Sequence, residues 1–265
     1  MERREDVQGR RELLREAQER ISLRRLVVAG DEPELARLLE LFPGGVEQLD
    51  GGFAVYVDGE PAERSLRASF DVVEAAGVEA GWEDGWRAFH HGVVVGRFWV
   101  GPPWEEPPTG VATIVIEPGR AFGTGAHPTT RLTLELLQEQ APVGVLDVGC
   151  GSGVLSIAAA KLGFAPVCAL DVDASAVEVA TENARANGVD LDARLSDALS
   201  DDLPACDLVV ANVALGVVEA LLPRVGAARA ITSGYLDRDE PRASGRRRVE
   251  RRVADGWAAD LFVMA

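Results

Sequence analysis

The chain has 265 residues, of which 47% are hydrophobic and 26% charged, and its formal net charge is −16. This composition is typical of a folded globular protein that holds a catalytic domain and a small second one. The negative charge argues against direct binding of a nucleic acid backbone, which needs a basic face, and it favours basic partners.

Targeting and metal signals are missing from the sequence. No apolar run approaches the roughly 20 residues of a membrane span, and residues 1–6 lack the apolar core of a secretory signal, so a cytoplasmic protein without membrane contact is expected. The cysteines and histidines show neither a disulfide framework nor metal-ligand spacing, and we expect no metal site. They are Cys150, Cys168 and Cys206, and His90, His91 and His127.

The first part of the chain predicts a small α+β domain. Residues 1–22 form a polar, charged lead, and residues 23–80 alternate between strand-like and helix-like patterns. The predicted elements are a strand at Leu23–Val28, a helix at Asp31–Phe42, strands at Gly45–Leu49 and Phe53–Val57, and a helix at Ala62–Ala76. We expect this domain to recruit the substrate.

Residues 81–110 are rich in tryptophan and proline and are predicted to link that domain to a second one at 111–265. The tryptophans stand at 82, 86, 99 and 104, and the prolines at 102, 103, 107 and 108. Two interpretations are open for the tryptophans: a hydrophobic seam at a hinge, or an aromatic surface that binds a peptide.

An unusual loop, residues 117–130, precedes a predicted helix at Arg131–Gln138. Pro128 suits the first turn of this helix, and His127 is a candidate N-cap. The loop can alternatively act as a lid, because Phe122 and the hydroxyls of Thr124, Thr129 and Thr130 can reach a ligand on the neighbouring glycine turn. A structural cap needs none of these side chains.

Residues 143–153 predict a buried strand and a tight glycine turn, followed by a helix at Val154–Leu162. Such a turn lies where a parallel sheet binds a nucleotide-like ligand, and it needs glycine for positive φ and close backbone approach. Val154 breaks the dinucleotide spacing G-x-G-x-x-G. The pattern is instead an acid, Asp147, followed by Gly149, Gly151 and a third glycine at 153.

Three further strand ends carry polar residues. Asp171 ends a buried run that starts at residue 165, at the distance expected of a carboxylate that binds ribose hydroxyls. Asp173 is predicted to cap the following helix, which Gly188 ends. Asp197 can face an adenine amino group or be solvated, and Asn212, at the end of an apolar strand, can serve a site or start a turn.

Four segments together closely resemble the PrmA family of ribosomal protein L11 methyltransferases, which are class I enzymes dependent on S-adenosylmethionine. The segments are residues 121–130, 147–158, 169–173 and 209–212. The resemblance implies an α/β fold, a Rossmann-like doubly wound sheet with a smaller N-terminal α+β domain. It also implies S-adenosylmethionine as cofactor, contacted by Thr130, Gly149, Asp171 and Asn212.

The activity implied is transfer of methyl groups to lysine side chains and the N-terminal amine of a basic ribosomal protein, with Asn212 positioning the amine. We expect a monomer. The alternatives are methylation of another protein's lysine, methylation of a small amine, and cofactor binding without catalysis.

The C-terminal part departs from the family pattern. After Leu222 the chain reaches Ile231–Tyr235 without the usual Pro-Gly-Gly turn, so we expect the far edge of the sheet to be trimmed. The arginines at 246–248 and 251–252 predict a solvated face, with an anion site as the alternative.

Overall fold

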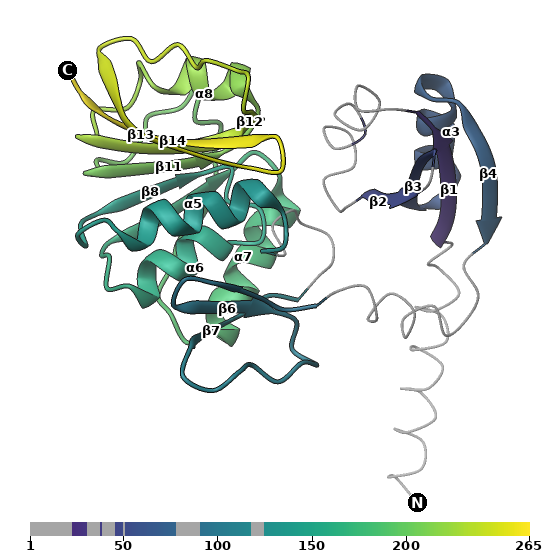
Figure 1. Ribbon diagram of the computed structural model, residues 1–265, viewed down its shortest axis with the longest axis horizontal. Coiled ribbons are helices and arrows are strands. Elements are labelled where there is room, and N and C mark those ends of the chain that lie inside the picture. Colours follow the sequence, from purple (N-terminus) through teal and green to yellow (C-terminus); the bar gives the residue numbers. More distant parts are fainter. Residues whose placement is uncertain (1–22, 31–37, 39–45, 50, 78–90, 118–124) are drawn as a thin grey trace, which may run out of the picture. The chain divides into compact units, whose positions relative to one another are not determined.

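The computed structural model describes residues 23–30, 38, 46–49, 51–77, 91–117 and 125–265. It divides into two compact units, Met1–Arg87 and Ala88–Ala265 (Figure 1). The polar lead, most of the predicted helix Asp31–Phe42, and the lid residues Phe122 and Thr124 lie outside the described residues.

The first unit holds a four-stranded antiparallel sheet in the order β2-β3-β1-β4. Its elements are β1 (Leu23–Ala29), β2 (Val46–Leu49), β3 (Gly52–Asp58), α3 (Gly59–Ser69) and β4 (Val72–Gly77). Leu26 and Val28 of β1, Phe53 and Val55 of β3, and Leu66 of α3 are buried in one core. The described strands and helix form a small α+β fold, in the strand order of ferredoxin-like units.

The predicted helix Ala62–Ala76 is wrong in its second half. The helix ends at Ser69, and the residues after it form β4, which pairs with β1 so that Ala75 lies opposite Leu26. The run Glu74-Ala-Ala76 has a helical preference, but pairing with the edge of β1 outweighs that preference, as tertiary context often does.

The second unit contains a seven-stranded sheet in the order β10-β9-β8-β11-β12-β14-β13. The first five strands in this order are parallel, and β14 and β13 are antiparallel to their neighbours. The strands are β8 (Val145–Val148), β9 (Val167–Asp171), β10 (Asp192–Leu195), β11 (Leu208–Asn212), β12 (Arg229–Leu236), β13 (Arg246–Ala254) and β14 (Trp257–Met264). The doubly wound, Rossmann-like sheet is therefore confirmed.

The expected trimming of the sheet's far edge is wrong. Beyond β12 the sheet continues with β14 and β13, which form a long hairpin. The short part of this region is instead α8 (Leu215–Leu221), together with the connection that leads from it to β12. The missing Pro-Gly-Gly turn thus corresponds to a short connection between α8 and β12, and the strands β12, β13 and β14 are all present.

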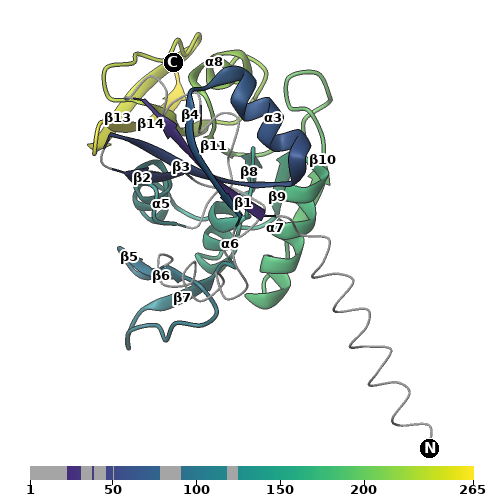
Figure 2. The same ribbon diagram turned by 90° about the vertical axis from the view of Figure 1, so that its right-hand side faces the viewer.

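Helices cover both faces of the large sheet. α5 (Pro128–Gln138), α6 (Val154–Lys161) and α7 (Ala174–Ala186) lie on one side of the strands and α8 on the other (Figures 1 and 2). Successive residues of β8 show this layering, because Val145 belongs to the core beneath α5 and α6, and Leu146 to the core beneath α8. None of the described helices combines the length and the apolar character that crossing a membrane requires.

The predicted linker differs from the structure between residues 93 and 101. β5 (Val93–Val95) and β6 (Phe98–Gly101) form a three-stranded sheet with β7 (Ala112–Val115), on the α6 side of the large sheet (Figure 2). Phe98, Val100 and Ile114 are buried in the same core as α5 and α6. This segment folds with the second unit because its apolar residues complete that core.

Trp99 is buried within the second unit and does not lie at the division between the units. Its side chain is 3% exposed and lies against two glycines. A Cβ on Gly92 would come within 2.2 Å of the indole ring, and one on Gly101 within 2.3 Å. The tryptophans at 82 and 86 lie outside the described residues, so the two interpretations of those positions stay predictions.

Candidate functional site

The order of the large sheet marks one position for a ligand. From β8 the chain moves outward through β9 and β10 on one side, and β11 and β12 continue the sheet on the other. Open α/β sheets bind ligands at such a switch point, at the carboxyl ends of the strands. The glycine turn follows β8 there, and Asn212 ends β11 beside it.

The glycine turn adopts the conformation that its residues predict. Gly149, Gly151 and Gly153 have φ angles of 72°, 53° and 78°, in the left-handed region that favours glycine. A Cβ on Gly149 would lie 2.3 Å from Cγ1 of Val213, and one on Gly153 would lie 3.1 Å from Cβ of Ala180 in α7. The turn therefore needs glycine both for its dihedral angles and for its close packing.

Asp171 is oriented toward this turn by two backbone amides. Gly151 N–H donates to its Oδ2 at 2.9 Å, and Asp173 N–H donates to its Oδ1 at 3.0 Å. Each carboxylate oxygen has a second lone pair, so two further donors can bind. A vicinal diol such as that of ribose presents two hydroxyl donors of this kind.

Asp173 is a helix cap, as its position before α7 predicts. Its Oδ1 accepts a hydrogen bond from Ser175 N–H at 2.8 Å, and its own backbone is extended. The two neighbouring acids therefore have separate tasks, one at the ligand edge and one at the start of a helix.

Asn183 supports the glycine turn and was not identified from the sequence. It lies buried in α7, and its Nδ2 donates to the carbonyl oxygen of Ser152 at 2.9 Å. The sequence carries one signal for it, since asparagine is unfavourable in a helix interior unless its side chain finds a specific partner.

Thr130 and Asn212, 82 positions apart in the chain, are neighbours in the structure. Asn212 Nδ2 lies 3.4 Å from Thr130 Oγ1, which belongs to the buried first turn of α5. Within the described part of the chain, Oδ1 of Asn212 has no hydrogen-bond partner. The amide therefore keeps an acceptor available at the switch point.

His127 caps α5, which confirms the capping interpretation for this residue. Its Nδ1 lies 2.7 Å from Thr129 Oγ1 and accepts from Thr129 N–H at 3.3 Å. The ring also stands edge-on to Trp257, with 4.9 Å between centroids. Burial, with a smaller contribution from Arg131, lowers the pKa of His127 to about 4, so the ring is neutral at pH 7.

Asp147, the acid that leads the glycine pattern, is buried at 1% exposure. Ser156 Oγ donates to its Oδ2 at 2.6 Å, and its Oδ1 has no hydrogen-bond partner among the described residues. Burial raises the pKa of this carboxyl to about 6, and the nearby charge of Asp171 adds to the rise.

Asp197 lies at the same edge of the sheet as Asp171, because Leu195 of β10 pairs with Asp171 of β9. Its exposed carboxylate accepts from Leu199 N–H and Ser200 Oγ, each at 2.9 Å. Beside Asp171, the side chain of Val172 is 70% exposed. This apolar surface at a polar edge suits a flat base, and no pattern in the sequence distinguished it.

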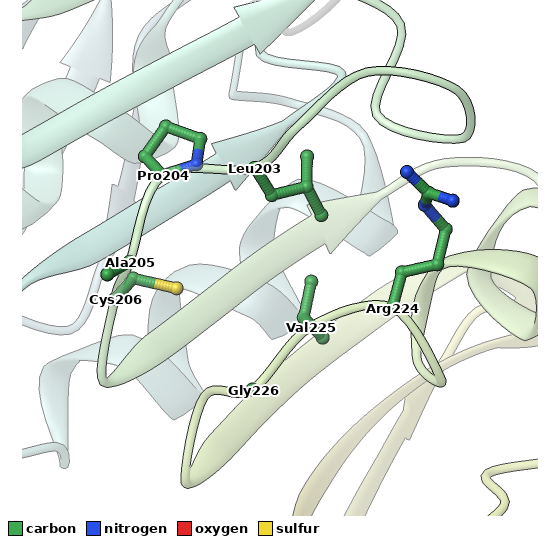
Figure 3. A pocket seen from close by; sticks show the side chains of 7 residues that line it. All are labelled: Leu203, Pro204, Ala205, Cys206, Arg224, Val225 and Gly226. Carbon is green, nitrogen blue, oxygen red and sulfur yellow. The ribbon is translucent and has the colours of Figure 1, made fainter.

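A separate pocket of about 200 Å³ lies at the opposite edge, before the first residues of β11 and β12 (Figure 3). It is lined by Leu203, Pro204, Ala205, Cys206, Arg224, Val225 and Gly226. Burial raises the pKa of the Cys206 thiol to about 11, so it is not a thiolate at neutral pH. Within the described ranges, no three His, Cys, Asp or Glu residues gather as metal ligands would.

Comparisons with known proteins agree with one family. The family model for ribosomal protein L11 methyltransferase (PrmA) matches residues 59–246. The ribosomal protein L11 methyltransferase of Symbiobacterium thermophilum is 40% identical over 189 residues, which are 68% of this chain and 60% of that protein. The protein of the same name from Caldanaerobacter subterraneus subsp. tengcongensis is 42% identical over 153 residues, 56% of this chain and 50% of that protein.

A solved structure, that of ribosomal protein L11 methylase from Lactobacillus delbrueckii subsp. bulgaricus, matches with a TM-score of 0.61 and 29% identity. The match covers 66% of this chain and 98% of that one. The chain spans about half to three fifths of the length of the curated relatives it matches. By the family match over most of its length, and with the class I methyltransferase fold, the chain belongs to the ribosomal protein L11 methyltransferase (PrmA) family.

Proposed function

We propose that the protein transfers methyl groups from S-adenosylmethionine to amino groups of ribosomal protein L11, at lysine side chains and the N-terminal amine. The observation that carries the proposal is the arrangement at the switch point. There Asp171 is held by the Gly151 amide, and Asn212 meets Thr130 across the glycine turn. The family model for ribosomal protein L11 methyltransferase matches residues 59–246, a range that includes all four of these residues.

The residues at the switch point fit S-adenosylmethionine. Asp171 has lone pairs for both ribose hydroxyls, and Gly149 and Gly151 have no side chain that would hold a ligand away from the backbone. Asp197 would accept from the adenine amino group. Phe122, Thr124 and Thr130 would cover the methionine end. Bound there, the cofactor supplies a methyl group on a positively charged sulfur.

The protein's part in the transfer is to orient a neutral amine. Asn212 Oδ1 accepts an amine hydrogen, which directs the nitrogen lone pair, and orientation with exclusion of water can contribute about 7–11 kcal/mol. Among the described residues, neither His127 nor Asp147 is placed as a general base, because His127 uses Nδ1 as a helix cap and Asp147 is buried behind Ser156. The ammonium group therefore loses its proton to water.

The first unit would recruit the protein substrate, since the proposed cofactor contacts all belong to the second unit. A net charge of −16 suits a basic ribosomal protein. The proposal includes action as a monomer in the cytoplasm, where ribosomal proteins are made.

The test is incubation of the full-length protein with methyl-labelled S-adenosylmethionine and one acceptor at a time: L11, a second basic ribosomal protein, or small amines. We expect label in L11, with mass spectrometry placing it on lysine and N-terminal amines. Label only in the second protein or in small amines would overturn the acceptor assignment. Cofactor binding without label in any acceptor would show a non-catalytic protein.

A further inference from the structure

We propose that Gly234 is a positioning residue, which sets the place of Asn212 through the residue that follows it, Val213. The inference rests on the proposed function, because the task of Asn212 belongs to it. Gly234 has no side chain, and the side chain of Val213 is apolar. Their contribution is geometric.

Gly234 is the extra residue of a bulge between β12 and β14. Ser233 pairs with Ala259 and Tyr235 with Ala258, so Gly234 has no partner in the register. Its φ is 99°, which already favours glycine. A Cβ at this position would lie 2.2 Å from the carbonyl oxygen of Val213, 2.7 Å from its carbonyl carbon and 2.9 Å from its nitrogen. These are backbone atoms, which cannot avoid the collision by changing rotamer.

Val213 is held on two sides. Its N–H donates to the carbonyl oxygen of Ser233 at 3.0 Å, which ties it to the bulge. Its Cγ1 occupies the space beside Gly149, where a Cβ would come within 2.3 Å. Val213 thus lies between the bulge and the glycine turn, so a shift of its backbone must move Asn212 relative to Thr130.

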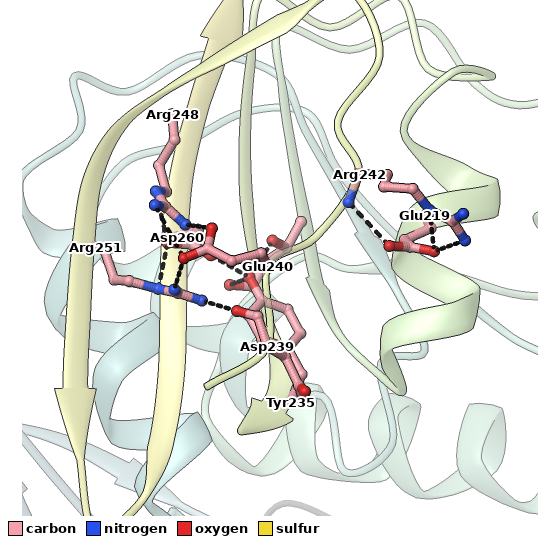
Figure 4. A network of polar contacts seen from close by, with 9 residues as sticks. Glu219, Tyr235, Asp239, Glu240, Arg242, Arg248, Arg251 and Asp260 are labelled. Carbon is pink, nitrogen blue, oxygen red and sulfur yellow. Dashed lines mark hydrogen bonds and ion pairs between the residues drawn. The ribbon is translucent and has the colours of Figure 1, made fainter. Parts of the chain in front are cut away.

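A buried polar network anchors the bulge. The Tyr235 hydroxyl lies 2.7 Å from Thr232 Oγ1 and 3.0 Å from Asp260 Oδ2, and all three residues are at most 2% exposed. Asp260 forms ion pairs with Arg251 at 3.1 Å and with Arg248 at 3.7 Å, and both arginines also contact Glu240 (Figure 4).

Arg251, whose side chain is 18% exposed, thus has its partners within the protein. Arg248 is ion-paired as well but is exposed, which agrees with the predicted solvated face. Burial raises the pKa of Asp260 and of the Tyr235 phenol. A buried polar network of this kind contributes little net stability but can specify one arrangement of the chain. Here it specifies the register on both sides of Gly234.

The experiment compares Gly234→Ala with Gly163→Ala. Gly163 also has a positive φ, 88°, but a Cβ there would meet no atom within 4 Å. Both changes place an alanine at a positive φ, and only the first collides with Val213. We expect Gly234→Ala to lower kcat for methylation of L11 by on the order of tenfold or more and to raise the Kd for S-adenosylmethionine by a smaller factor, because Asn212 is also a predicted cofactor contact. Gly163→Ala should leave both unchanged.

A second readout does not depend on activity. In Gly234→Ala the side-chain amide resonances of Asn212, assigned by NMR without cofactor, should shift, and in Gly163→Ala they should not. Unshifted resonances, or a kcat that falls equally in both variants, would overturn the inference. If the wild-type protein transfers no methyl group, the proposed function fails, and the NMR comparison still decides the positioning role.

If Gly234→Ala does not fold, Tyr235→Phe is the alternative variant for this test. It keeps the ring and removes only the hydroxyl that joins Thr232 to Asp260. We expect a folded protein with shifted Asn212 resonances and a lowered kcat. Wild-type resonances and kcat in this variant would overturn the inference.

Discussion

At the scale of single residues, the structure separates acids that look alike in the sequence. Asp171 ends β9 and Asp173 follows it by two residues, yet the first accepts from Gly151 N–H and the second caps α7. Asp147 stands at the end of the preceding strand but is buried against Ser156. Position relative to the sheet edge, more than residue type, decides which carboxylate can reach a ligand.

Substitution of Asp171 should change cofactor affinity, and substitution of Asp173 should change stability. We expect Asp171→Ala to weaken binding of S-adenosylmethionine by about 1.5–3 kcal/mol, the range for hydrogen bonds that involve a charged group. Asp173→Ala should cost about 1 kcal/mol of stability through the lost cap and leave affinity unchanged. Calorimetry and denaturant unfolding measure the two effects. Unaltered affinity in Asp171→Ala would remove this residue from the site.

Thr130 is buried in the first turn of α5 and contributes to packing, so an alanine substitution would remove both its hydroxyl and its packing contacts. Thr130→Val keeps the shape and removes the hydroxyl, and Thr130→Ser keeps the hydroxyl and removes the methyl group. If the hydroxyl serves the site through Asn212, the valine variant should lose cofactor affinity or turnover and the serine variant should keep both. Equal losses in both variants would point to packing alone.

At the scale of elements, the start of α5 combines the cap at His127 with a contact to the β13–β14 hairpin. The ring of His127 meets Trp257, and Nη2 of Arg131 donates to Asp255 Oδ2 at 2.6 Å. The helix that carries Thr130 is thus held by the far end of the sheet. A cap that is a neutral imidazole also makes this helix start sensitive to pH.

The pKa of His127 is lowered from its ordinary value of 6.5 to about 4, so the unfolded state binds the proton more tightly than the folded state. Its contribution to the free energy of unfolding is present above pH 6.5 and is lost as the pH falls toward 4. His127→Asn keeps a capping side chain that does not titrate. We expect the wild type to lose more stability than this variant between pH 7 and pH 4.5, measured by urea unfolding.

Asp147 changes the free energy of unfolding in the opposite direction to His127 over the same pH range. The comparison of wild type with His127→Asn, which both keep Asp147, is therefore necessary. The pKa of Asp147 is raised from 3.8 to about 6, so its contribution favours the folded state at low pH and is lost as the pH rises through 6. Because Asp147 is present in both proteins, its effect cancels in the comparison. Parallel stability curves for wild type and His127→Asn would contradict the lowered pKa of His127.

At the scale of the whole molecule, the two units divide the chain at Arg87–Ala88, well before the end of the predicted linker. β5 and β6 supply Val95, Phe98 and Val100 to the core of the second unit. A fragment of this unit must therefore include them to be folded, although the proposed cofactor contacts all lie beyond residue 121.

Two fragments test this division. A fragment of residues 88–265 should bind S-adenosylmethionine within about threefold of the full chain, since domains with their own core fold alone, and should lose nearly all transfer to L11. A fragment of residues 111–265 exposes the core face of Ile114 and should melt at a lower temperature or aggregate. Methylation of L11 by the longer fragment at the full-length rate would refute recruitment by the first unit.

The sequence by itself determined the parts of the site whose residue types are forced locally. The glycine turn needs positive φ, Asp171 needs the end of a buried strand, and His127 with Pro128 fits a helix start, so each could be predicted from its immediate neighbours. The doubly wound sheet was expected from the resemblance to the PrmA family, and the order of its strands came from the structure.

Only the tertiary structure decided the features that depend on partners distant in the chain. β4 forms because β1 offers it an edge, β5 and β6 join a core built by α5 and α6, and Gly234 matters because Val213 lies against it. Short strands and buried polar residues have weak local preferences, so packing and pairing, which local sequence does not contain, determine their structure and their role.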